Sequence, residues 1–126
     1  MAGASGTSSE NRALAERLAA RLLPLGPIET RRFFSGSGLS LDGTLFAFVV
    51  QGTLWLRVDA ASLPAFEAAG CRPFRYSTSL REVTVRAWWS APDEAVMVPE
   101  VLQDWAARAL KAARANPPKR RRKKKA

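Results

Sequence analysis

The sequence contains no histidine and only one cysteine, Cys71. Without histidine, the chain cannot build a Ser-His or Cys-His nucleophile pair, or a metal site that uses imidazole. A single cysteine also excludes thiolate zinc clusters and a disulfide-stapled secreted fold. Cys71 follows the expected C-terminus of a helix, where the dipole disfavours a thiolate, so we expect an inert thiol.

The carboxylates offer no substitute for this missing chemistry. Asp42, Asp59 and Asp93 occupy positions typical of turns and helix caps, which leaves no obvious paired acid and base. We therefore predict a non-enzymatic protein with no catalytic residues, no metal site, no cofactor and no small-molecule substrate.

Long hydrophobic runs are missing too. The longest, residues 45–50, is far below the roughly 18 residues that span a membrane. Residues 1–10 show neither the basic segment nor the apolar stretch of a secretory signal. We expect no membrane span and a cytoplasmic location. With 126 residues, 47% of them hydrophobic, the chain has material for one core and not for two.

Positive charge is abundant, but it is concentrated at one end. The formal net charge is +9, and seven consecutive cations supply most of it: Lys119, Arg120, Arg121, Arg122, Lys123, Lys124 and Lys125. The other residues hold 13 basic and 11 acidic side chains, a net +2. They include one lysine, Lys111, against twelve arginines, whereas the tail has four lysines in seven positions. The composition of the tail therefore departs from that of the body.

The tail follows Pro117-Pro118 and is expected to stay solvated and unfolded. Flexible cations bind polyanions by counterion release, with a salt slope of up to about −6 if all seven meet phosphates. Such contacts do not read base sequence. We favour nonspecific nucleic-acid binding; binding to acidic lipid or protein and a purely solubilising role remain open alternatives.

Helical periodicity predicts three helices. A stripe of leucines behind a capping box indicates a first helix over residues 9–23. Asp59 is placed to cap a second, short helix that Gly70 ends. A helical turn at residues 92–94 precedes a final amphipathic helix that Pro99 opens.

Alternating side chains and turn residues predict five strands, over residues 28–34, 39–41, 45–50, 53–58 and 83–89. The first has the character of an edge strand, and residues 45–50, apolar on both faces, that of a central strand. Asp42-Gly43 is a pair that a type I′ hairpin prefers, and Gln51-Gly52 makes the next turn. Residues 71–79 are interpreted as a connection.

These elements predict the α+β class, with an antiparallel five-stranded sheet packed with helices in the order α-β-β-β-β-α-β-α. The folded domain is expected over residues 9–115. A disordered leader, 1–8, precedes it, and the Lys/Arg-rich tail, 116–126, follows it.

A candidate surface comes from strand alternation. Trp55 and Arg57 on one strand and Arg86 and Trp88 on another are expected to share a sheet face. Aromatic rings interleaved with arginine can stack nucleic-acid bases. Tryptophans on a sheet also pack against helices or against a second copy, and we favour this interface or core role over base stacking.

The pair Gly36-x-Gly38 suggests a phosphate-binding loop. Such a loop needs a helix N-terminus behind it, whereas a strand and a hairpin follow here. We interpret the segment as a glycine-rich connection between strands.

Three segments together resemble the N-terminal domain of the TfoX/Sxy competence-regulator family. The first, residues 31–47, contains Arg31-Arg32 and Leu41-Asp42-Gly43 on either side of the glycine pair. The second is residues 66–76, around Gly70-Cys71-Arg72-Pro73. The third runs from Trp88-Trp89 through Pro92-Asp93-Glu94 to Pro99-Glu100 and the helix at 105–110.

The resemblance spans roughly residues 10–113. It implies a compact α+β domain similar to secretion-chaperone-like folds, and a link to the regulation of competence, with no catalytic residues. Ser35 and Ser37 depart from the family pattern, where a glycine and an aromatic stand. Full-length regulators of the family carry a second domain, so their complete role is not carried over to this chain.

The function expected from these observations is that of a non-enzymatic regulatory protein. Its tail would add nonspecific affinity for nucleic acid. The alternative is a chaperone-like or scaffold module that binds a protein partner or forms a homodimer, with an incidental tail.

Overall fold

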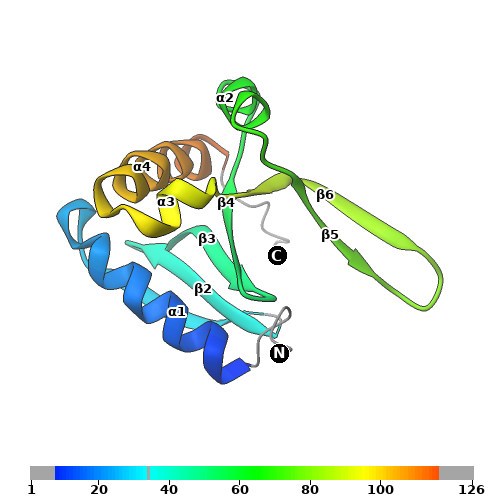
Figure 1. The fold of residues 1–126 in the computed structure, drawn as a ribbon, viewed down its shortest axis with the longest axis horizontal. Coiled ribbons are helices and arrows are strands. Elements are labelled where there is room, and N and C mark those ends of the chain that lie inside the picture. Colours follow the sequence, from blue (N-terminus) through cyan, green and yellow to red (C-terminus); the bar gives the residue numbers. More distant parts are fainter. Residues whose placement is uncertain (1–7, 34, 117–126) are drawn as a thin grey trace, which may run out of the picture.

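The computed structural model describes residues 8–33 and 35–116, apart from the side chain of Ser8. Thr7 of the predicted capping box and the seven tail cations lie outside this range. The elements in chain order are α1 (Ser8–Arg21), the 3-10 turn η1 (Leu23–Leu25), β1 (Ile28–Phe33), β2 (Gly36–Leu41), β3 (Thr44–Val50), β4 (Thr53–Arg57), α2 (Leu63–Ala68), β5 (Pro73–Ser77), β6 (Glu82–Ser90), α3 (Asp93–Met97) and α4 (Pro99–Ala115) (Figure 1).

The strands of the described residues form one antiparallel sheet in the order β1-β2-β3-β4-β6-β5. β1 is an edge strand and β3 is central, as predicted. The prediction of five strands was wrong, because residues 73–77 form β5 rather than a connection. Phe74 and Tyr76 alternate with Arg75 in this strand, and β6 supplies the pairing partners that so short a segment lacks by itself.

The glycine-rich segment is also a strand rather than a connection, since β2 begins at Gly36. A Cβ atom at Gly36 would overlap the carbonyl oxygen of Val49 on β3, and one at Gly38 would lie 2.8 Å from Cδ1 of Leu45. These two glycines therefore let β2 approach β3 closely, and their strand geometry leaves no phosphate-binding loop here.

Two tight turns connect the central strands. Asp42 and Gly43 have φ of 52° and 81°, and Gln51 and Gly52 have φ of 58° and 73°. Positive φ at both central positions is the requirement of a type I′ hairpin. Both predicted turns are confirmed.

One face of the sheet carries the main core, covered by α1 and α4 (Figure 1). Leu18 and Leu22 of α1 and Leu102 of α4 are almost fully buried there. Phe66 of α2 joins them, edge-on to the ring of Trp105 with the ring centroids 4.8 Å apart. Burying such side chains contributes about 1.5–3 kcal/mol each, which positions the helices on the sheet.

The opposite face of the sheet carries a second cluster, which we call the aromatic cluster. Its members are Phe33, Phe48, Val50, Trp55, Phe74, Val85 and Trp88. Phe48 of β3 lies at its centre, with ring-centroid distances of 4.8 Å to Phe33, 5.1 Å to Phe74 and 4.9 Å to Trp88. The cluster links both halves of the sheet.

A buried polar residue, Asn11, ties α1 to two turns of the sheet. Its side chain is 2% exposed. The amide nitrogen donates to the carbonyl of Ser35 at 3.4 Å, and the amide oxygen accepts from the backbone N–H of Gly52 at 2.9 Å. Because these contacts span 24 and 41 residues of sequence, Asn11 fixes the position of the N-terminal part of α1.

The β5–β6 hairpin projects from the body of the molecule (Figure 1). β4 pairs with β6 only at residues 88–90, so the more distant part of β6 pairs with β5 alone. We call this two-stranded ribbon and its flanking residues, 72–86, the arm.

Candidate nucleic-acid interface

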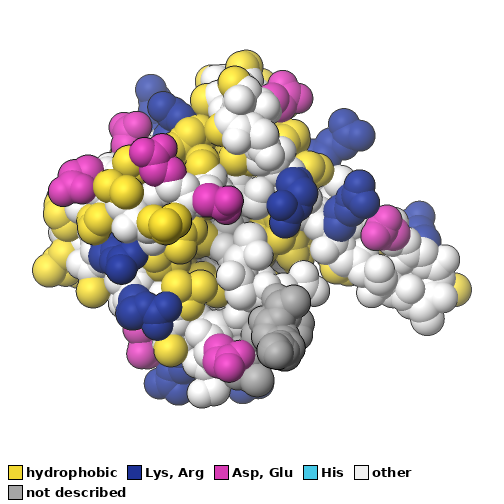
Figure 2. All heavy atoms as spheres, in the orientation of Figure 1, with side chains coloured by type: hydrophobic (Ala, Val, Ile, Leu, Met, Phe, Trp, Pro, Cys, Tyr) yellow, Lys and Arg dark blue, Asp and Glu magenta, His cyan; other side chains and the backbone are white. Residues whose placement is uncertain are grey.

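The arm concentrates positive charge. Residues 72–86 contain one acidic side chain, Glu82, and four basic ones: Arg72, Arg75, Arg81 and Arg86. Figure 2 shows dark-blue side chains from the base of the arm toward its tip, with one magenta side chain among them. The arm is therefore +3, and the remaining described residues hold nine basic against ten acidic side chains. The net positive charge of the folded part resides in the arm.

Glu82 neutralises little of this charge. Its carboxylate lies 3.6 Å from the guanidinium of Arg75, and both side chains are more than half exposed. Exposed pairs of this kind contribute about 0–1 kcal/mol and are screened by salt. A polyanion can therefore compete for Arg75.

The tip of the arm is an ordered turn. The hydroxyl of Thr78 accepts the backbone N–H groups of Leu80 and Arg81, at 3.2 and 3.1 Å. The N–H of Thr78 donates to the carbonyl of Arg81 at 2.8 Å. These bonds close the turn while the side chain of Leu80 stays 90% exposed. The tip thus presents an apolar side chain next to arginine.

Three of the four residues predicted to share a sheet face come together at the base of the arm. Arg57 and Trp88 are register partners on β4 and β6, and the guanidinium carbon lies 5.8 Å from the centroid of the Trp88 ring. Trp55 is in the same aromatic cluster. It is only 5% exposed, and its indole N–H donates to the carbonyl of Val50 at 3.3 Å. Trp55 is thus a core residue here, which leaves Trp88 as the half-buried member.

The side chain of Arg86 is exposed and does not pack with these three residues. Its carbonyl oxygen instead accepts the indole N–H of Trp89 at 2.9 Å. The register of β5 with β6 shifts between Pro73 and Phe74, so the strict alternation predicted for β6 fails. Val85 and Trp88 pack on the aromatic cluster, and Trp89 packs against the main core.

The last described residue, Asn116, lies close to the base of the arm. Its carbonyl accepts from Nη2 of Arg57 at 3.3 Å, and its side-chain amide donates to Asp59 at 3.4 Å. The seven predicted nucleic-acid contacts, residues 119–125, lie outside the described residues. They begin three positions after Asn116 in the chain, within roughly 10 Å of extended backbone. The chain therefore leaves the fold on the side where Arg57 meets Trp88.

The sequence identifies Arg86 as a possible interface residue but does not identify Arg72, Arg75 or Arg81. Arg72 and Arg75 lie in residues 71–79, which the sequence indicates to be a connection. One signal was present: Phe74, Arg75 and Tyr76 alternate, and a Ser/Thr-rich turn follows. Alternation over three residues cannot by itself separate a strand from an extended loop. Pairing with the long strand β6 is what makes residues 73–77 a strand.

Cys71 is partly buried just after α2. Burial raises the pKa of its thiol, Arg72 opposes this effect and Asp93 adds to it. A raised pKa keeps the sulfur protonated at neutral pH, which is the opposite of a reactive thiolate. The expectation of an unreactive thiol agrees with this environment.

Among the described residues, no group of three or more His, Cys, Asp or Glu side chains is arranged to hold a metal ion. Within the same part of the chain, no helix is both long enough and apolar enough to cross a membrane.

The fold and surface define a small α+β domain with an antiparallel sheet, helices over one face and a basic projection. A comparison with protein families matches residues 20–113 to the TfoX N-terminal domain. The chain belongs to this family, which confirms the membership indicated by the three sequence motifs. The family is of a regulatory, non-catalytic type and is related to competence. A comparison with curated proteins found no match.

Proposed function

We propose that the protein is a regulatory protein that associates with nucleic acid through one continuous basic surface, made of the arm and the C-terminal tail. The observation that carries the proposal is the charge of the arm, which is +3 whereas the rest of the described chain is −1. An asymmetric field of this kind steers polyanions to one side of a protein.

The shape of the arm supports this function. Two-stranded ribbons fit the grooves of duplex DNA, and exposed apolar side chains at their tips can wedge between base steps. The arm offers such a side chain in Leu80, 90% exposed, with Arg81 beside it. Its arginines would hold phosphates, and these contacts position a protein without reading base sequence.

The tail would add to the same surface, because the chain leaves the fold beside Arg57 at the base of the arm. Each phosphate neutralised steepens the salt dependence by about 0.9. We therefore expect a slope of up to about −3 from the net charge of the arm and up to about −6 from the tail.

The test measures binding to a short fluorescent DNA duplex across a salt series. Four chains are compared: the full chain, the chain truncated after Pro118, an arm variant (Arg75→Ser, Arg81→Ser, Arg86→Ser) and a matched control. The control removes three exposed cations elsewhere (Arg17→Ser, Lys111→Ser, Arg114→Ser).

Truncation and the arm substitutions are each expected to weaken binding and flatten the salt slope, while the control has a much smaller effect. Equal losses in the arm variant and the control would show that only total charge matters. Unchanged affinity after truncation would remove the tail from the proposal.

The alternative, a module that pairs with another copy through the tryptophan face, loses one of its anchors because Trp55 is buried and hydrogen-bonded. An exposed surface suited to pairing exists instead along β5, an edge strand that carries the 40% exposed Tyr76. Sedimentation of the full chain separates the two functions. A dimer that Tyr76→Ser dissociates would favour the interaction module, whereas a monomer favours the nucleic-acid surface.

A further inference from the structure

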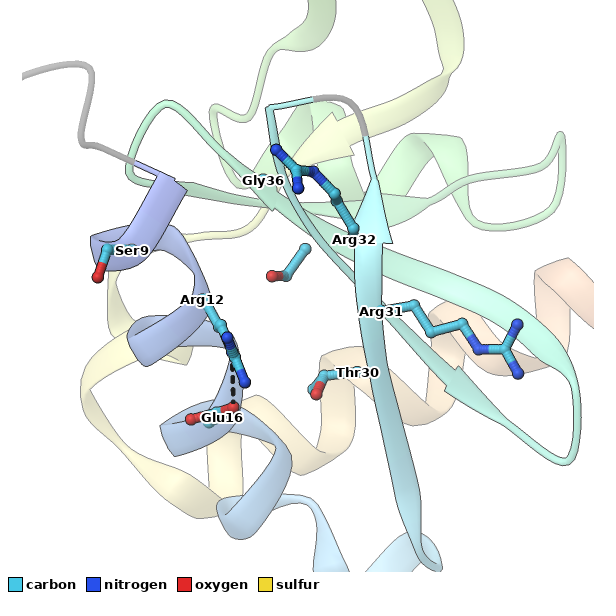
Figure 3. Close-up of a pocket in the computed structure, with 8 residues that line it drawn as sticks. Ser9, Arg12, Glu16, Thr30, Arg31, Arg32 and Gly36 are labelled. Atoms are coloured by element: carbon cyan, nitrogen blue, oxygen red, sulfur yellow. Dashed lines mark hydrogen bonds and ion pairs between the residues drawn. The ribbon is translucent and has the colours of Figure 1, made fainter.

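A polar hollow lies between the N-terminal half of α1 and the end of the sheet formed by β1 and β2. Its volume is about 480 Å³, within the range of small-molecule sites. The lining residues are Ser9, Arg12, Glu16, Thr30, Arg31, Arg32, Gly36 and Ser37. Figure 3 shows Thr30 between β1 and α1, and Arg32 extending toward Gly36. The hollow lies on the helix-covered face, away from the arm.

Ser37 is the unusual residue of this hollow. Its side chain is 5% exposed, and it lies opposite Arg32 in the β1–β2 register. Leu39 and Leu41, at alternate positions of β2, belong to the main core under the helices, so Ser37 faces the same side. No partner for its hydroxyl occurs among the described residues. A buried hydroxyl without a partner costs about 1–3 kcal/mol, and such a group in a native protein requires an explanation.

The groups around Ser37 are mainly hydrogen-bond donors. Arg32 has no ion pair or hydrogen bond with the described chain. Thr30 and Ser9 add hydroxyls, and Ser9 lies in the first turn of the 14-residue helix α1, where backbone N–H groups lack intrahelical acceptors. The one lining carboxylate, Glu16, already lies 3.3 Å from Nε of Arg12. The charge of Arg32, the hydroxyls and a helix N-terminus together favour an oxyanion, since Glu16 and Arg12 offset each other.

From this geometry we infer a second binding site, one for the phosphate group of a small phosphorylated molecule, in the hollow between α1 and the β1–β2 pair. Arg32 supplies the main charge, and the hydroxyl of Ser37 donates to a phosphate oxygen. The site is separate from the basic surface of the arm and tail, and it does not depend on nucleic-acid binding by that surface.

The test titrates the full chain with inorganic phosphate, with adenosine monophosphate and with adenosine, at constant ionic strength, and follows backbone amide shifts by NMR. Phosphate and the monophosphate are expected to produce saturable shifts at residues 30–37 and in the first turn of α1. Adenosine is expected to produce none, because it lacks the phosphate. A monophosphate that binds more tightly than phosphate would identify an ester rather than free phosphate as the preferred ligand.

Two neighbouring arginines provide a matched pair of variants. Arg32→Gln is expected to weaken phosphate binding at least about tenfold, since it removes a charge-assisted hydrogen bond. Arg31→Gln removes the same charge from the next residue, which borders the hollow but extends its side chain to the other side of β1 (Figure 3). This variant is expected to change binding less than about twofold. Similar effects of the two variants, or the absence of saturable shifts, would overturn the inference.

The Ser37→Ala variant distinguishes a serine that binds phosphate from one that only stabilises the fold. Because the hydroxyl has no partner among the described residues, the variant is expected to unfold at the same or a higher temperature without phosphate, while binding phosphate several-fold more weakly. A destabilised variant with unchanged phosphate affinity would contradict the proposed role. Neither Arg32→Gln nor Ser37→Ala is expected to change the salt slope of duplex binding. The phosphate site and the nucleic-acid surface of the arm are therefore tested independently.

Discussion

At the scale of single residues, the prediction that Asp59 caps the second helix was wrong. The residue before α2 is Ser62, which makes no side-chain capping bond, and Asp59 instead closes the turn that precedes the helix. Its carboxylate accepts the backbone N–H of Ser62 at 3.0 Å, and the Ser62 hydroxyl accepts the N–H of Asp59 at 3.1 Å. These reciprocal bonds precede α2 and connect residues only three apart. A contact of such short range is set by residue type and spacing.

The turn closed by Asp59 has a predictable dependence on pH. The hydrogen bond from Ser62 is the main cause that lowers the pKa of this carboxyl below its ordinary value, against opposition from burial. Because the folded pKa is the lower one, the stabilisation is present above the unfolded pKa of about 3.9 and is lost as the pH falls through the folded pKa.

Asp59→Ala is therefore expected to lower the free energy of unfolding by about 1 kcal/mol at pH 7, measured by urea denaturation. This difference should shrink in measurements below pH of about 4. Asp59→Asn is the control, because asparagine can accept the same turn hydrogen bond without titrating. A loss for Asp59→Ala that is equal at acid and neutral pH would show that packing, and not the carboxylate, is responsible.

Asn11 shows the opposite case at the same scale. In the sequence it lies seven residues before Leu18, on the face of the predicted leucine stripe, so the helical period indicates its burial but not its partners. Its two partners, Ser35 and Gly52, come from turns far along the chain. No local pattern could reveal this role, because it depends on where α1 docks. The burial of the Ser37 hydroxyl, which has no partner within residues 8–33 and 35–116, has no local signal for the same reason.

At the scale of elements, β2 and β5 mark the limits of prediction from local pattern. The start of β2 was assigned to a loop because Gly36 and Gly38 have low strand propensity. In the sheet Gly36 is required, since the backbone of β3 leaves no room for its Cβ atom, whereas a Cβ atom at Gly38 would displace only the end of the Leu45 side chain. β5 was missed because a short strand beginning with proline acquires its identity from pairing with β6.

Substitutions at two glycines separate close packing from backbone strain. Gly36→Ala is expected to destabilise the fold by at least about 3 kcal/mol, because its Cβ would overlap the carbonyl of Val49. Gly70 has φ of +78° and open space where a Cβ atom would lie, so Gly70→Ala should cost only the left-handed backbone strain of about 1–2 kcal/mol. Denaturant unfolding of both variants provides the measurement. A larger loss for Gly70→Ala than for Gly36→Ala would contradict the close packing of β2 on β3.

At the scale of the whole molecule, charge and stability are divided between different parts of the chain. The main core lies under α1 and α4, whereas the net positive charge lies in the arm and the tail. The helix α4 already ends at Ala115, where the N–H of Asn116 donates to the carbonyl of Ala112 at 3.1 Å. We therefore expect the cations after Asn116 to contribute little to the stability of the described fold.

Truncation after Pro118 is consequently expected to leave the unfolding midpoint in urea unchanged at moderate salt, while it weakens duplex binding. A truncated chain that unfolds at clearly lower urea would mean that the tail also contacts the folded domain. The arm variant is the control, because it alters charge without shortening the chain.

The sequence by itself determined the α+β class, the antiparallel meander, the type I′ turn at Asp42-Gly43, the turn at Gln51-Gly52 and the start of α4 at Pro99, and its motifs identified the family. These features depend on side-chain period and on contacts between residues a few positions apart. Only the tertiary structure decided that residues 73–77 form a sixth strand, that Trp55 is buried, and that the charge of the body gathers on one arm. The hollow beside α1 has the same physical cause, because helix docking places Arg12 of α1 near Arg32 and Ser37 of the sheet. The separation of these segments in sequence carries no local signal.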